Sequence, residues 1–177
     1  MKNKLATTIS LFCAAFASFG VNAQDNLGDQ VYRVYLSKHV AFETNNFQEA
    51  QNNRIWSAAL NLAWQSVGKN NSSGGVLSVP VYRCVILNSY KGQEHFASRD
   101  FNCEGQTREG IYGYVYPVQV LGTVPLFRVY AHNNEYGVSS HATFDSEVKF
   151  TQSALNYDQA WYSREGTIGY VYPSPAW

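Results

Sequence analysis

Alternating apolar and polar positions recur at intervals along the chain and predict strands. The segments Val31-Tyr-Arg-Val-Tyr35, Val81-Tyr-Arg-Cys-Val85 and Leu126-Phe-Arg-Val-Tyr130 are built from β-branched and aromatic residues around a central arginine. Two of the three follow a proline, which is tolerated at the start of a strand. Turn-forming residues then occur at 88–92 and 133–137, so we expect a returning strand after each.

One stretch has helical periodicity instead. Its apolar residues recur at spacings of three and four, which places them on one helical face, and Gly68 just beyond is a stop signal. These residues are Ile55, Trp56, Ala59, Leu60, Ala63 and Trp64. The pattern predicts a helix whose buried face includes Trp64, with a weaker helix over 147–155. The polar run 70–75 is expected to be an exposed loop.

Self-comparison divides the chain into three repeats. The decapeptide REGIYGYVYP at 108–117 returns as REGTIGYVYP at 164–173, with eight of ten positions identical. The repeats span about 31–79, 80–124 and 125–177, and each contains one of the three arginine strands. Segments this short do not bury a core alone, so we expect them to share one.

The expected fold is mainly β with short helices. Three strand-rich repeats of this length predict a pseudo-threefold, β-trefoil-like domain, in which closure removes exposed strand edges. An α+β repeat domain is the alternative. A histidine follows the arginine of each repeat, at His39, His95 and His141.

The N-terminal 23 residues have the pattern of a secretory signal peptide. Two lysines precede a largely apolar stretch over 5–19, and Ala23 is a small residue suited to cleavage before Gln24. We therefore expect residues 24–177 to form a single domain of three repeats that is secreted or periplasmic. No apolar run is long enough for a membrane span.

Charge restricts the possible partners, and cysteine content agrees with export. Without the signal peptide, eleven basic residues face thirteen acidic ones, and the arginines form no basic run. Because nucleic-acid binding needs a basic face, we expect no such partner. Cys84 and Cys103 remain, and in an oxidising compartment they are expected to form a disulfide. A loop of about twenty residues closed in this way contributes roughly 3 kcal/mol.

These repeats resemble a family of secreted bacterial and fungal tandem repeats of obscure function. The family pattern is Pro-[Leu/Val]-Tyr-Arg-x-Tyr, then His-Phe-x-[Ser/Thr], a helical turn and Glu-Gly-Ile-x-Gly-Tyr-Val-x-Pro. The second repeat matches from Pro80 to Pro117, the third has Phe127 for Tyr and Ala142 for Phe, and the first is degenerate. Such repeats are often appended to cell-wall hydrolases. The resemblance therefore implies an accessory binding role, and it supplies neither a ligand nor a catalytic residue.

No familiar catalytic spacing is present, so we expect no enzymatic activity, no cofactor and no metal. Glu109 and Glu165 are equivalent, which favours a repeated structural task, such as capping a turn or pairing with a strand arginine, over acid–base catalysis. Each histidine is expected to hydrogen-bond a carbonyl or a tyrosine of its own repeat. A metal-dependent hydrolase built on three converging histidines is a remote alternative.

The favoured function is a secreted binding module for a cell-wall or surface glycan. Tyrosines are more numerous than a core favours, since each buried hydroxyl needs a partner, so some rings should be available to stack on sugars. The candidate ligand-binding residues are Arg83, His95, Tyr114, Arg128, His141, Trp161, Tyr162 and Tyr170. We expect clefts between the histidine strand and the strand of the decapeptide, in which Tyr114 or Tyr170 stacks on a sugar ring and His95 or His141 donates a hydrogen bond to it. The alternative is a periplasmic protein-binding inhibitor or immunity-type protein.

Overall fold

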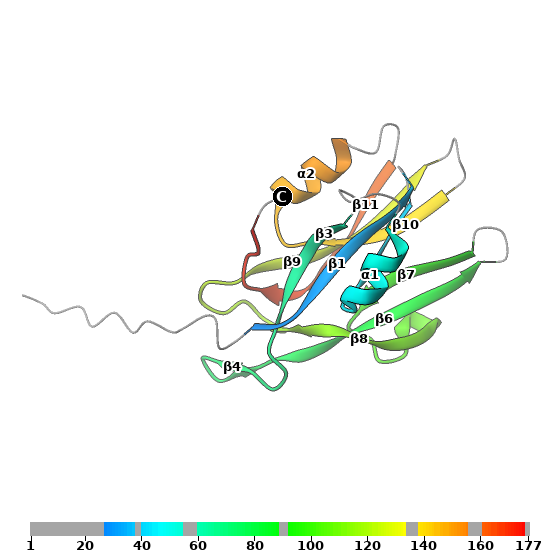
Figure 1. The fold of residues 1–177 in the computed structure, drawn as a ribbon. Helices are drawn as coiled ribbons and strands as arrows, with labels where there is room; N and C mark the ends of the chain where they lie inside the picture. Colours follow the sequence, from blue (N-terminus) through cyan, green and yellow to red (C-terminus); the bar gives the residue numbers. More distant parts are fainter. Residues whose placement is uncertain are drawn as a thin grey trace, which may run out of the picture.

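The computed structural model describes residues 27–37, 40–54, 60–88, 92–133, 138–155 and 161–175. Within them the chain is mainly β with two short helices (Figure 1). In chain order the elements are β1 (Leu27–Ser37), β2 (Val40–Thr44), α1 (Phe47–Asn53), β3 (Leu60–Val67), β4 (Ser72–Ser73), β5 (Val76–Leu77), β6 (Val79–Asn88), β7 (Gly92–Ser98), a 3-10 turn (Cys103–Gly105), β8 (Thr107–Val115), β9 (Val124–Asn133), β10 (Val138–Phe144), α2 (Glu147–Leu155) and β11 (Trp161–Val171). The predicted signal peptide lies outside the described residues.

The strands form a curled six-stranded sheet, ordered β2-β1-β3-β8-β6-β7, and a three-stranded sheet, ordered β10-β9-β11 (Figure 1). Strands β4 and β5 make a small separate hairpin. Three units of three strands recur, namely β2-β1-β3, β7-β6-β8 and β10-β9-β11, each with its arginine strand in the middle. The predicted mainly β class is confirmed, whereas the sheet order does not by itself define a β-trefoil.

The stretch that was expected to be helical is strand β3, which pairs with β1. Its register shifts between Val31 and Tyr32, so Ala63 has no partner, and both Ala63 and Trp64 are buried. A bulge of this kind breaks the alternation of a strand and leaves apolar spacings that resemble a helix. The predicted burial of Trp64 is confirmed. Residues 55–59 lie outside the described part of the chain, and the second expected helix is present as α2.

The central core draws on all three units. Trp64, Tyr112 and Leu126 are its largest members, and each is at most 1% exposed. The whole cluster consists of Val31, Ala63, Trp64, Val81, Ala97, Tyr112, Val115, Leu126, Ile168 and Val171. No unit therefore has to bury its apolar face alone.

One glycine allows the two larger sheets to meet. A Cβ added at Gly169 would lie 2.3 Å from Val115 Cγ2 and 2.9 Å from the carbonyl oxygen of Tyr116. At this approach Tyr116 and Tyr170 exchange two backbone hydrogen bonds of 2.9 Å. Gly113 has the corresponding place in β8. The second glycine of the repeated decapeptide is therefore required by packing.

No helix in the described part of the chain is long and apolar enough to cross a membrane.

Candidate functional site

Three arginines occupy equivalent places in the middle strands, Arg33 in β1, Arg83 in β6 and Arg128 in β9. Their side chains are at most 15% exposed. A guanidinium withdrawn from water to this extent requires charged or polar partners, because an unpaired buried charge is strongly destabilising. The partners differ between the units and define three clusters.

The Arg33 cluster is fully buried. Arg33 Nη2 donates to Glu43 Oε1 at 2.9 Å, and the guanidinium lies 4.1 Å from the centre of the Phe144 ring. Arg33 also donates to the carbonyl of Thr143, while the Glu43 carboxylate accepts from the backbone N–H and the hydroxyl of Thr143. This cluster joins the first unit to the third and has a structural role.

The Arg83 cluster joins the first unit to the second. Arg83 donates to Glu49 of α1 at 2.7 and 2.9 Å, and its Nε lies 2.9 Å from Glu109 Oε2. The start of α1 positions Glu49, because Asn46 caps the helix by accepting the Glu49 N–H and the Thr44 hydroxyl donates to the Glu49 carboxylate. Hydrogen bonds from Arg83 lower the pKa of Glu49.

The Arg128 cluster joins the second unit to the third. Arg128 donates to Glu104 at 2.7 and 3.0 Å, to Glu165 at 2.7 Å and to the carbonyl of Ala97 at 2.8 Å. The hydrogen bonds from Arg128 lower the pKa of Glu104. Arg83 and Arg128 therefore each combine one carboxylate from the last strand of their own unit with one from the preceding unit.

Bulges explain the repeated Glu-Gly of the decapeptide. Strand pairing skips Glu109 in β8 and Glu165 in β11. The extra residue of a bulge is released from the ladder, so its side chain is free to turn toward a neighbouring strand. Here the two carboxylates meet Arg83 and Arg128, and the predicted pairing of these glutamates with strand arginines is confirmed.

His95 and His141 lie beside these clusters with carboxylates as partners, in place of the expected carbonyl or tyrosine. His95 Nε2 is 3.0 Å from Glu109 Oε2 and 3.2 Å from Arg83 Nη2, so it can donate to the first or accept from the second. His141 Nδ1 is 2.7 Å from Glu94 Oε1. Burial, followed by the charge of Arg83, lowers the pKa of His95.

The three histidines are not equivalent in the strand register. His95 and His141 stand opposite the residue two positions beyond the strand arginine, and in the first unit Ala41 stands there, opposite Tyr35. His39 lies outside the described residues. Among the residues that the structure describes, no group of three or more His, Cys, Asp or Glu side chains could hold a metal ion.

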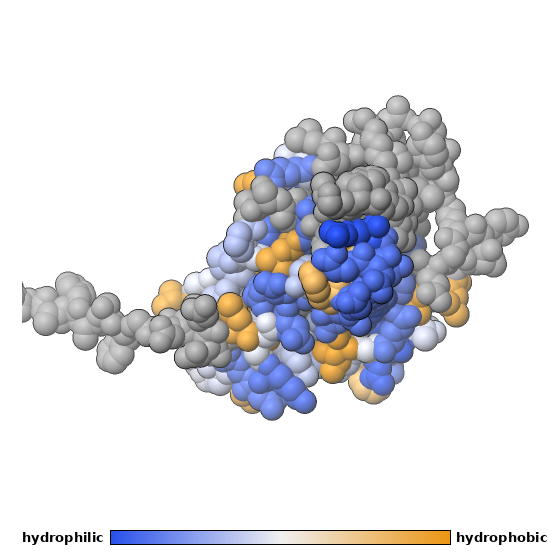
Figure 2. All heavy atoms as spheres, viewed as in Figure 1, coloured by the Kyte–Doolittle hydropathy of each residue, from blue (hydrophilic) through white to orange (hydrophobic). Residues whose placement is uncertain are grey.

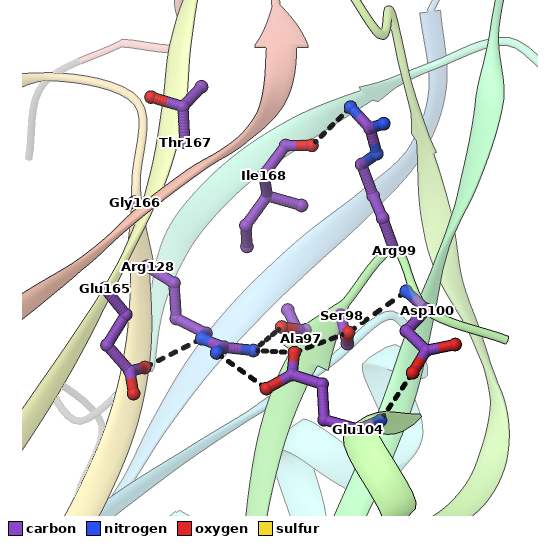
Figure 3. A pocket seen from close by; sticks show the side chains of 10 residues that line it. All are labelled: Ala97, Ser98, Arg99, Asp100, Glu104, Arg128, Glu165, Gly166, Thr167 and Ile168. Carbon is purple, nitrogen blue, oxygen red and sulfur yellow. Dashed lines mark hydrogen bonds and ion pairs between the residues drawn. The ribbon is translucent and has the colours of Figure 1, made fainter. Parts of the chain in front are cut away.

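A pocket of about 280 Å³ opens beside the Arg128 cluster (Figure 3). The end of β7, the turn after it and β11 form its wall. Its lining residues are Ala97, Ser98, Arg99, Asp100, Glu104, Arg128, Glu165, Gly166, Thr167 and Ile168. Arg99 donates across it to the carbonyl of Ile168 at 3.2 Å. The pocket therefore lies between the second and third units.

The turn that carries Asp100 and Glu104, residues 99–105, is held rigidly. The Asp100 carboxylate accepts two backbone N–H groups of the turn. The predicted disulfide between Cys84 and Cys103 is confirmed and ties the turn to β6. Cys103 and Glu104 adopt φ of 52° and 55°, a left-handed conformation that costs a non-glycine residue about 1 kcal/mol or more. These constraints together present Glu104 to Arg128.

The tyrosines expected in the histidine clefts lie elsewhere. Tyr114 pairs opposite Pro80 of β6, whereas His95 pairs opposite Val85. Five strand residues span about 16 Å at about 3.3 Å each. Tyr170 has the same offset in β11. The structure therefore brings the arginines and histidines together but does not bring these tyrosines to them.

The two remaining candidates lie at the start of β11. The Tyr162 ring is half-buried and meets the Phe150 ring edge to face at 5.6 Å. It packs against an apolar cluster beneath α2 and does not line the pocket. Trp161 pairs with His132 of β9, and its side chain lies outside the described residues.

Sequence reasoning missed the acidic residues that come from turns, Glu49 and Glu104. A signal for Glu49 was present, because Asn46 is a helix-capping residue three positions before it. The signal for Glu104 was weaker: Asp100, four positions before it, is a turn-forming residue. Arg99 had no comparable signal.

The strand units, the arginine–glutamate clusters and the polar pocket define a mainly β protein with a candidate site between two of its strand units. Residues 30–172 match the model of a family described as a domain of unknown function, DUF5648, and the chain belongs to that family. No curated protein and no solved structure matches the chain.

Proposed function

We propose that the protein is a non-enzymatic binding module for a cell-wall or surface glycan and that the pocket beside Arg128 is its principal site. The observation that carries the proposal is the chemistry of the pocket wall. Guanidinium and carboxylate groups stand next to a little apolar surface from Ala97 and Ile168. Sugars offer hydroxyl groups that both donate and accept, together with C–H faces, so they match such a wall.

The rigidity of the wall supports this function. Arg128 is held between Glu104 and Glu165, so a ligand does not have to order it. Arg99 is exposed and uses Nη1 for the carbonyl of Ile168, which leaves further N–H groups for a ligand. Guanidinium and carboxylate groups that are already fixed in place can distinguish sugars by the directions in which their hydroxyl groups point.

The surface also favours a glycan over a protein partner. Figure 2 shows that the face carrying α1 is largely hydrophilic, with hydrophobic residues in small separate groups. Protein-binding faces usually carry a contiguous apolar patch. One feature favours a protein partner, because Val118 and Leu121, in the connection after β8, are 53% and 97% exposed. An inhibitor or immunity-type protein is therefore the second candidate.

We also propose that the three units are related by rotation about a common axis, in a β-trefoil-like manner. Contacts from unit to unit support this arrangement: α1 reaches Arg83, the turn after β7 reaches Arg128, and β10 reaches Arg33. The arrangement makes Gly113 and Gly169 equivalent. It predicts that alanine at either glycine destabilises the protein, as measured by urea unfolding.

Retention of the purified protein on insoluble peptidoglycan and chitin tests the glycan proposal. Thr167→Trp should fill the pocket from an exposed position on β11 without removing an ion pair, and should lower retention by about tenfold or more. Thr107→Trp is the matched control, since it places the same side chain at an exposed threonine of β8 that does not line the pocket.

Failure of both polymers to retain the wild-type protein would refute glycan binding of this kind. Equal retention of the two variants would refute the pocket as the site. Recovery of one stoichiometric protein partner from periplasmic extract, lost in Leu121→Ser, would favour the second candidate instead.

A further inference from the structure

Arg108 and Arg164 hold the same position in the repeated decapeptide, but the groups that surround the two guanidinium groups differ. In the third unit Arg164 Nη2 lies 2.8 Å from each carboxylate oxygen of Glu147. The same guanidinium lies 4.1 Å from the centre of the Phe127 ring. An aromatic face and a carboxylate thus complete the surroundings of this arginine.

In the second unit the equivalent guanidinium, that of Arg108, contacts aromatic rings but no carboxylate among the described residues. The Arg108 guanidinium lies 3.7 Å from the centre of the Phe101 ring and 5.5 Å from that of Tyr82. The two rings meet edge to face at 5.7 Å. Within the described ranges of the chain, Arg108 has no carboxylate partner. Its side chain is exposed.

The cause is one residue. Asp100 and Ser146 cap the turn and the helix that follow them, and the next residues are Phe101 and Glu147 respectively. Phe101 therefore stands in the second unit where the third unit has the carboxylate. The third unit shows which group fits this guanidinium, and the second unit lacks that group.

We propose that Arg108, Phe101 and Ile111 bind a carboxylate-bearing sugar of an acidic glycan. The planar guanidinium offers paired N–H donors that match a carboxylate, and stacking on Phe101 restricts its rotation. Phe101 is 58% exposed and Ile111 is 43% exposed, so both offer apolar surface to the C–H face of a sugar ring. Ile111 stands opposite Tyr82 in the strand register. This inference rests on the proposed glycan-binding function and names the class of glycan.

Polygalacturonate and its carboxyl-reduced form, each immobilised on beads, provide the test because they differ in the carboxylate alone. Wild type should bind polygalacturonate about tenfold more tightly, which corresponds to about 1.4 kcal/mol. The preference should weaken as salt is raised, since exposed charges are screened. Arg108→Gln should remove the preference.

Two further variants make the test specific. Phe101→Glu keeps Arg108 but installs the internal carboxylate of the third unit, so it should also abolish the preference. Arg164→Gln is the matched control, because it removes the same charge from the same repeat position where Glu147 already occupies the arginine. It should keep the preference, and circular dichroism should show all three variants folded.

Equal binding of the two polymers by wild type, or a preference that survives Arg108→Gln, would overturn the proposed site. An equal loss in Arg164→Gln would overturn it as well, because it would show a general charge effect. Preference for poly-glutamate over polygalacturonate would replace the acidic glycan with an acidic peptide. Retention on peptidoglycan or chitin that is blocked by Thr167→Trp would leave the pocket proposal standing in each of these cases.

Discussion

Gly169→Ala is expected to destabilise the protein severely although it adds only one methyl group. The new Cβ would lie 2.3 Å from Val115 Cγ2 and 2.9 Å from the carbonyl oxygen of Tyr116. A change of rotamer moves Val115 Cγ2 but not Val115 Cβ, which would lie 2.8 Å from the new methyl group, and the backbone oxygen cannot move unless the strands separate. Overpacking of this kind costs about 1–3 kcal/mol.

Separation of the strands has a second cost. It breaks the two hydrogen bonds between Tyr116 and Tyr170, each worth about 1 kcal/mol. The free energy of unfolding should therefore fall by about 3–5 kcal/mol, out of the roughly 5–15 kcal/mol that is typical of a folded protein. Gly113→Ala should cost less, about 1–3 kcal/mol, because its Cβ would meet Ser66 Oγ at 2.7 Å, Ser66 Cβ at 2.8 Å and Trp64 Cη2 at 3.2 Å, and its nearest contacts do not include a carbonyl oxygen whose displacement breaks strand hydrogen bonds.

Gly110→Ala is the control, since a Cβ at Gly110 would meet nothing within 4 Å. Urea unfolding followed by tryptophan fluorescence should rank the losses as Gly169 above Gly113 above Gly110, with the last near zero. Adding Val115→Ala to Gly169→Ala should recover part of the loss by removing the nearest clash. A Gly169→Ala protein within about 1 kcal/mol of wild type would refute the reasoning.

Replacing Cys84 and Cys103 by serine should lower the free energy of unfolding by about 3 kcal/mol, because the disulfide closes a loop across 19 positions. It should also weaken polymer binding, since the disulfide fixes the turn that carries Glu104; unchanged urea unfolding would contradict the entropic argument. Acidification should lower stability in two stages. The pKa of His95 is lowered in the folded state by burial and by Arg83, so the unfolded chain binds more protons below pH 6.5. The lowered pKa values of Glu49 and Glu104 add a second decline below about pH 4.5. Urea midpoints measured from pH 8 to about pH 2.5 should lose only the first stage in His95→Gln, and an unaltered profile would contradict this assignment.

The strands around the arginines could be predicted because alternation of residue types survives in them. β3 could not, since the bulge at Ala63 turns two consecutive residues inward and imitates a helix. The short helix α1 carries a single buried residue, Ala50, so its apolar pattern is too weak to detect. Only its cap, Asn46 followed by Glu49, marked its position.

The part of the candidate site that could be predicted consists of residues that occur at the same position in more than one repeat. Arg83, Arg128 and their bulge glutamates follow from repetition alone. The contribution of Glu104 depends on a turn whose path is set by a disulfide and by left-handed residues, which leave no periodic signal. The sequence predicts Tyr114 and Tyr170 in the histidine clefts, but strand register determines which residues are neighbours, and it separates them by five positions.

Ion pairs that run from one unit to the next have a consequence for how this family can change its repeat number. Deleting residues 79–123 would remove Arg83 and Glu104 together, so Glu49 would lose its arginine and Arg128 would keep Glu165 as its ion-pair partner. Because Arg33 of the first unit also donates to Thr143 of the third, the units contact one another in a closed order, and loss of one copy changes two junctions at once, unlike the end-on growth of a solenoid array. We therefore expect the number of units per protein in this family to vary less than in solenoid proteins, where a repeat can be added at one end without changing the other contacts.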